Sequence, residues 1–115
     1  MIVLYGIKNC DSVRKARKLL QANNREYLFQ DFREKAVDEE TIRDWIDKGV
    51  TIKELFNTRG TTYRTLKLKD VTLTDEDKIK WLAKENMLIK RPVIVDNNGS
   101  IVVSYDENKI SSILN

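Results

Sequence analysis

The stretch IVLYGIKNCDSVRKA, residues 2–16, predicts a strand that passes through a short turn into a helix. Residues 2–5 are apolar and favour a β-strand, and residues 6–9 are typical of a turn. A helical pattern begins after Cys10 and extends over residues 11–23, where apolar residues recur on one side. That side consists of Val13, Ala16, Leu19 and Leu20. The chain therefore opens with a strand–turn–helix unit that has a thiol where the helix starts.

The next segments predict a parallel strand pair followed by helices. A second strand is expected at residues 27–32, and because a helix separates it from the first, the two should be parallel. Residues 38–48 favour a helix, residues 51–56 a short helical turn and residues 57–64 a polar loop. Another helix is expected from Thr74, with Asp77 completing a capping box.

The last third of the chain changes to a period of two. Residues 92–96 and 100–104 favour strands, and Asn97-Asn98-Gly99 between them is a hairpin signal. A terminal helix is expected from Asp106. The order is therefore β-α-β, a helical insertion over residues 38–88, and then β-β-α. We expect an α/β fold with a four-stranded mixed sheet.

Composition favours one cytoplasmic domain covering residues 1–115. The chain is 41% hydrophobic and 34% charged, with neither a membrane-spanning run nor a signal peptide in its sequence. The net charge of +3 comes from interspersed charges, so we expect no direct nucleic-acid or membrane partner. One cysteine and no histidine exclude a Cys–His hydrolase, and we expect no metal site and no bound cofactor.

Cys10 is the candidate nucleophile. Free N–H groups at a helix start, together with the helix dipole, favour a thiolate over a thiol. We expect the backbone amides of Ser12, Val13 and Arg14 to act as donors, and Arg91 to be the principal cation, followed by Arg59 and Lys8. The alternative for a lone cysteine is a buried small hydrophobic residue.

Pro92, the only proline, opens the third predicted strand. Proline lacks an N–H group and is tolerated at a strand start, which is the simpler interpretation. The predicted topology also brings the starts of the first helix and the third strand side by side. We therefore predict a cis Arg91–Pro92 bond opposite the Cys10 turn.

Three blocks of sequence carry a resemblance to a known family. They are residues 5–16 (YGIKNCDSVRKA), residues 55–63 (LFNTRGTTY) and residues 89–95 (IKRPVIV). In order and spacing they resemble the thioredoxin-like family of glutaredoxin-coupled arsenate reductases, Spx transcription regulators and YffB-like proteins, and most strongly the YffB-like branch. The resemblance covers nearly the whole chain and implies a thioredoxin-like fold.

The resemblance to arsenate reductases implies an incomplete oxyanion site. Those enzymes hold the oxyanion with three arginines, and Arg91 matches one of them. A second falls at Asn57, with Arg59 two residues away, and the third falls at Ser104. The reductases' histidine falls at Gly6. Because an oxyanion needs several charge-assisted donors, we expect at most weak arsenate reduction.

The resemblance also implies which thiol chemistry remains. Spx regulators have a C-x-x-C switch at this turn, but the second position here is Val13, so an internal disulfide is impossible. We expect a glutathione-dependent monothiol thiol–disulfide reductase, with glutathione or another small thiol as co-substrate. The alternatives are an Spx-like regulator that binds the RNA polymerase α subunit, or a weak arsenate reductase assisted by a glutaredoxin. The predicted catalytic residues are Cys10 and Arg91, and the predicted substrate-binding residues are Asn57, Arg59, Ser12, Val13 and Pro92.

Overall fold

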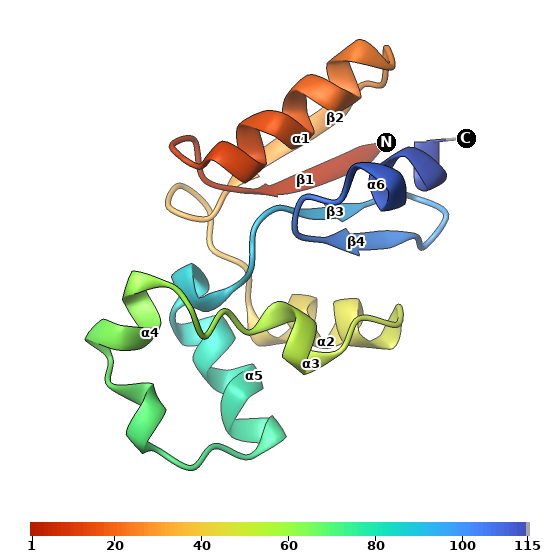
Figure 1. Cartoon of the computed structure of the whole chain (residues 1–115). Helices are drawn as coiled ribbons and strands as arrows, with labels where there is room; N and C mark the ends of the chain where they lie inside the picture. Colours follow the sequence, from red (N-terminus) through yellow and green to blue (C-terminus); the bar gives the residue numbers. More distant parts are fainter. Residues whose placement is uncertain (115) are drawn as a thin grey trace. The chain divides into compact units, whose positions relative to one another are not determined.

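The computed structural model describes residues 1–114, which form two compact units (Figure 1). One unit combines Met1–Lys35 with the chain from Arg91 onward, and the other consists of Ala36–Lys90. Asn115, the last residue of the predicted domain, lies outside the described residues. Within residues 1–114, no helix has the length and apolar character needed to cross a membrane.

The first unit is built on a four-stranded mixed sheet with strand order β2-β1-β3-β4. The strands are β1 (Ile2–Gly6), β2 (Tyr27–Asp31), β3 (Val93–Val95) and β4 (Ile101–Val103). The predicted parallel pairing of β1 with β2 is confirmed, while β3 runs antiparallel to both β1 and β4. Gly99 occupies the β3–β4 turn at a φ of 89°, a conformation open to glycine without steric cost. The predicted hairpin is therefore present.

Two helices cover one face of this sheet: α1 (Asp11–Ala22) and α6 (Glu107–Leu114). Alternate residues of β1 point toward them, as the period-two pattern predicts. The resulting core consists of Ile2, Leu4, Val13, Ala16, Leu20, Ile94, Val102 and Ile110. Because α1 starts directly above the end of β1, this packing fixes the position of the turn between them.

The second unit is helical. Its helices are α2 (Glu39–Asp47), α3 (Ile52–Leu55), α4 (Thr61–Thr65) and α5 (Asp75–Lys84), with short 3₁₀ turns η1 (Leu68–Asp70) and η2 (Asn86–Leu88). The predicted cap Asp38 accepts a hydrogen bond from the Thr41 N–H group, and the predicted Thr74–Asp77 capping box is complete. The predicted loop over residues 57–64 is wrong from Thr61 onward, where α4 begins. This helix buries none of its residues, so no apolar pattern could reveal it.

Asn86 joins both ends of the second unit. Its side chain is buried; it accepts a hydrogen bond from the Val37 N–H group at 2.8 Å and donates to the carbonyls of Val37 and Leu82. Backbone bonds from Asn57 to Leu88 and from Lys90 to Leu55 add a second connection. A buried amide with all these partners satisfied stabilises one arrangement of its neighbours.

Candidate functional site

Cys10 is the N-cap residue of α1, with extended backbone angles and no hydrogen bond from its side chain to the helix start. Its side chain is half-buried and packs against the edge of the sheet core. The thiol is therefore neither fully buried, as an inert core cysteine would be, nor used as a structural cap. This leaves its sulfur available for chemistry.

The donors around Cys10 differ in part from those predicted. The Arg14 N–H group donates to the Cys10 carbonyl at 3.0 Å, so the prediction that it serves the thiol is wrong. The N–H groups of Ser12 and Val13 lie in the first turn, where a helix offers no backbone acceptor. Val13 is fully buried, so its side chain cannot contact a substrate, and only its backbone remains a candidate donor.

Val13 packs against Gly6 at the end of β1. A Cβ atom added to Gly6 would lie 2.6 Å from Val13 Cγ2, closer than real Cβ contacts occur. The helix can approach the strand this closely only because Gly6 has no side chain. Val13 and Gly6, which the resemblance places at the second cysteine of Spx and at the histidine of the reductases, are thus in direct contact.

The turn that presents Cys10 is held by Asp31, a residue that sequence reasoning missed. Asp31 lies at the end of β2, is only 6% exposed, and accepts hydrogen bonds from the backbone N–H groups of Lys8 at 3.3 Å and Arg33 at 2.8 Å. The Lys8 ammonium, predicted to lie near the thiol, is instead paired with Glu34 at 2.7 Å, and this hydrogen bond raises the pKa of Lys8. The feature of the sequence that could have revealed Asp31 is an acidic residue at the end of an apolar strand.

The predicted cis Arg91–Pro92 bond is present. Tyr5 pairs with Val93 in the β1–β3 ladder, and continuing this register by one residue brings Pro92 opposite Gly6. The Cys10 turn and the cis bond therefore lie at the same edge of the sheet. Pro92 is buried and Arg91 is half-buried.

Ser104 lies beside Pro92, because its N–H group donates to the Pro92 carbonyl at 2.8 Å. It is exposed and follows the last residue of β4 with a φ of 65°. A third arginine at this position would have flanked the cis bond. A serine hydroxyl that donates to the Val103 carbonyl stands there instead.

Asn57 and Arg59, the other predicted substrate-binding residues, belong to the helical unit. The Asn57 carboxamide accepts a hydrogen bond from the Arg59 N–H group at 3.0 Å, so it shapes the loop before α4. Arg59 is exposed and lines a hollow together with residues of α4 and the segment that follows it. These assignments to substrate binding stay predictions.

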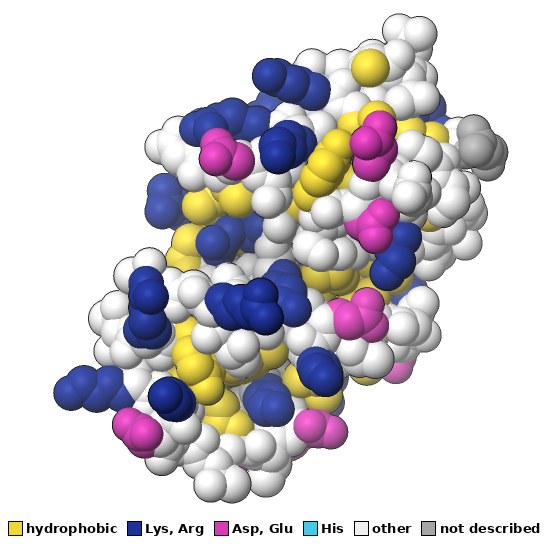
Figure 2. Space-filling model, in the orientation of Figure 1, with side chains coloured by type: hydrophobic (Ala, Val, Ile, Leu, Met, Phe, Trp, Pro, Cys, Tyr) yellow, Lys and Arg dark blue, Asp and Glu magenta, His cyan; other side chains and the backbone are white. Residues whose placement is uncertain are grey.

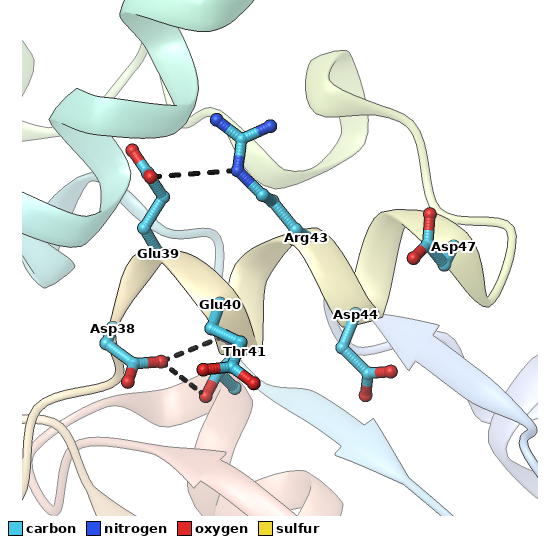
Figure 3. A pocket seen from close by; sticks show the side chains of 7 residues that line it. All are labelled: Asp38, Glu39, Glu40, Thr41, Arg43, Asp44 and Asp47. Atoms are coloured by element: carbon cyan, nitrogen blue, oxygen red, sulfur yellow. Dashed lines mark hydrogen bonds and ion pairs between the residues drawn. The ribbon is translucent and has the colours of Figure 1, made fainter.

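A second hollow, on α2, is lined mainly by carboxylates (Figure 3). Asp38 accepts hydrogen bonds from the Thr41 N–H group and hydroxyl, which lower the pKa of this carboxyl group. Arg43 is paired with Glu39 on its own helix and with Glu76 on α5. Among residues 1–114, no three acidic, cysteine or histidine side chains are placed so that they could hold a metal ion. We interpret this acidic face as a solvated, ion-paired helix surface.

Comparisons with known proteins agree with this arrangement. The ArsC family model matches residues 5–113. The structure of the YffB protein is similar with a TM-score of 0.89 and 30% identity, covering all of both chains. A possible arsenate reductase from Streptococcus mutans is 34% identical with a TM-score of 0.77, covering 91% of each chain. The global transcriptional regulator Spx of Staphylococcus aureus is 30% identical over 99% of this chain and 87% of its own length.

The family match covers the strand–turn–helix unit, the helical insertion and the cis-proline hairpin alike. The thioredoxin-like arrangement expected from the sequence is thereby confirmed together with the family that carries it. This chain belongs to the ArsC family.

Proposed function

We propose that this protein is a glutathione-dependent monothiol thiol–disulfide reductase with Cys10 as its nucleophile. The observation that carries the proposal is the environment of Cys10. It is a half-buried thiol at a helix start, on the sheet edge that also bears the cis Arg91–Pro92 bond, and a buried valine fills the position of a second cysteine. A lone thiolate of this kind can exchange with a disulfide but needs an outside thiol to be regenerated.

The reaction has two exchange steps. The Cys10 thiolate attacks the glutathione sulfur of a mixed disulfide, forming a Cys10–glutathione disulfide and releasing the substrate as a thiolate that takes up a proton. The thiolate of a second glutathione then attacks the bound glutathione sulfur, which releases glutathione disulfide and restores the Cys10 thiolate. The substrate disulfide is reduced by two electrons, and two glutathione units leave as one disulfide.

Residues beside Cys10 support binding of the peptide-like thiol. The backbone of Ser12 and Val13 offers donors at the helix start, and Arg91 supplies a cation for a glutathione carboxylate. The backbone at Pro92 lies at the same edge of the sheet as the Cys10 turn. Arg59, on the helical unit, stays a predicted second anion-binding group.

The test is the reaction of the reduced protein with glutathione disulfide, followed by mass spectrometry. We expect one glutathione to attach in the parent and none in C10S, since Cys10 is the only cysteine. A glutathionylated peptide should then be reduced catalytically with glutathione. R91K, which retains the charge, should lose less activity than R91A. Failure of the parent to form the mixed disulfide would refute the proposal.

Transcription regulation is the second candidate, favoured by the 30% identity to Spx over nearly the whole chain. Binding to the α subunit of RNA polymerase would support it. Because Val13 precludes an internal disulfide switch, such binding should not change between oxidising and reducing conditions. Mixed-disulfide formation without polymerase binding would leave the reductase as the function.

A further inference from the structure

The helical unit contains a hollow lined by basic side chains. Of these side chains, the proposed reaction uses only Arg59. The hollow has a volume of about 670 Å³ and is lined by the cations Arg59, Arg64, Lys67 and Lys69 together with Thr58, Tyr63 and Asp70. Volumes between about 300 and 1,000 Å³ are typical of sites for small organic ligands. Figure 2 shows Lys and Arg side chains gathered around exposed hydrophobic atoms on the part of the surface formed by this unit.

The charge of the hollow is not balanced by the protein. Elsewhere in the chain, Lys8, Arg14 and Arg43 are each paired with a carboxylate. The four cations of the hollow form no ion pair with any acid among residues 1–114. Asp70 is the one acid in the lining, so the hollow has a formal charge of 4 − 1 = +3. This equals the net charge of the whole chain.

Two further features indicate a built surface. The Tyr63 ring is held edge-to-face against Phe56, with centroids 6.0 Å apart and planes at 89°, and Phe56 is buried. Lys67 has a φ of 56°, a left-handed conformation that is unfavourable for a residue with a side chain. Lys67 follows the C-cap residue of α4, a position where helices commonly end in this conformation. A lysine thus stands where glycine would be relaxed, and it lines the hollow.

We propose that this hollow binds a nucleoside phosphate, with the phosphates on the cations and the flat base against Tyr63. Several unpaired cations suit a phosphate group, which is multiply charged and has several acceptor oxygens, better than a single carboxylate. Base–aromatic stacking adds the contribution of the ring. The proposal goes beyond the thiol chemistry, because Cys10 takes no part in the hollow.

The probe is ADP, titrated into the full chain by calorimetry at low and at physiological salt. ADP should bind more tightly than inorganic pyrophosphate, adenosine should not bind, and salt should weaken binding. R64A and K67G should each lower the affinity about three- to tenfold. K67G also removes the backbone strain, so its melting temperature should stay equal or rise. K18A, which deletes an exposed lysine of α1, is the matched charge control and should bind like the parent.

The ring has its own pair of variants. Y63F should retain ADP affinity, and Y63L should lower it to that of pyrophosphate. The proposal would be overturned if ADP does not bind at millimolar concentration, or if K67G, K18A and the parent bind ADP with equal affinity. The role of the ring would be overturned if Y63L and the parent bind ADP with equal affinity. C10S should bind ADP like the parent, whereas K67G should still form the Cys10–glutathione disulfide. The two proposals therefore fail independently.

Discussion

The contact between Gly6 and Val13 predicts a measurable coupling between the strand and the helix that present Cys10. In G6A the new methyl group would lie 2.6 Å from Val13 Cγ2 and 3.3 Å from Val13 Cγ1. Because Val13 is fully buried, it cannot rotate away into solvent. Overpacking of this kind costs about 1–3 kcal/mol.

The V13A substitution creates the opposite defect. Two buried methyl groups are removed, each worth about 0.8 kcal/mol of transfer free energy, and the cavity adds to this loss. We expect V13A to cost about 1.5–3 kcal/mol. In the double variant the methyl group that G6A introduces would occupy the space that the valine side chain vacates. The double variant should therefore be at least about 1 kcal/mol more stable than the sum of the single effects predicts.

Urea unfolding of the parent, both single variants and the double variant measures this coupling, provided that the slopes remain equal. Gly60 supplies the control, since an added Cβ would lie 2.8 Å from Asn57 Nδ2, the far end of a partly exposed side chain. G60A should cost about 0.5 kcal/mol or less, because that end can move. Additive effects of the Gly6 and Val13 substitutions, within about 0.5 kcal/mol, would refute the reasoning.

Three further predictions concern the Cys10 turn, the helix caps and the oxyanion site. D31A should lose about 3 kcal/mol of unfolding free energy and D31N about half of this, because hydrogen bonds to a carboxylate contribute about 1.5–3 kcal/mol each. Both substitutions should also slow the reaction of Cys10 with glutathione disulfide. The hydrogen bonds from Thr41 lower the pKa of Asp38 below its ordinary value of 3.8. The stability that this carboxylate contributes is therefore complete above pH 3.8 and is lost as the pH falls through the lowered pKa. The stability difference between the parent and D38N, measured by thermal melting, should be constant above about pH 4 and change below it. S104R should increase arsenate turnover with glutathione and glutaredoxin at little cost in stability, because Ser104 already has the left-handed φ of 65°; unchanged turnover would contradict the assignment of Ser104 to the third arginine position.

Local patterns were sufficient to predict most of the sheet unit. The apolar residues 2–5, the hairpin signal ending at Gly99 and the apolar side of α1 each follow a single clear period, and each forms the predicted element. Strand ends were less accurate: β3 and β4 stop one residue short at both ends of the predicted ranges. The end residues still pair across the hairpin, because the Asp96 N–H group donates to the Ser100 carbonyl and the Ser104 N–H group to the Pro92 carbonyl. The difference therefore concerns only the residue at which each strand is taken to end.

The helical unit was harder to predict because its short elements have little periodicity. The five residues of α4 bury nothing, and η1 and η2 have three residues each. The Thr51–Glu54 capping box at α3 could have been recognised from its spacing. Asn86 could not, since a single amide gives no indication that it will bridge Val37 and Leu82. Long-range polar contacts of this kind depend on tertiary placement.

The Gly6–Val13 contact also restricts which side chains the strand end beside Cys10 can carry. A histidine in place of Gly6 would need far more space than the methyl group that already collides with Val13. A cysteine in place of Val13 would start from a fully buried position. Ser104 already has a left-handed backbone conformation, so an arginine there would add no new backbone strain. Packing therefore constrains Gly6 and Val13 through each other, whereas the exposed position of Ser104 is free of this constraint.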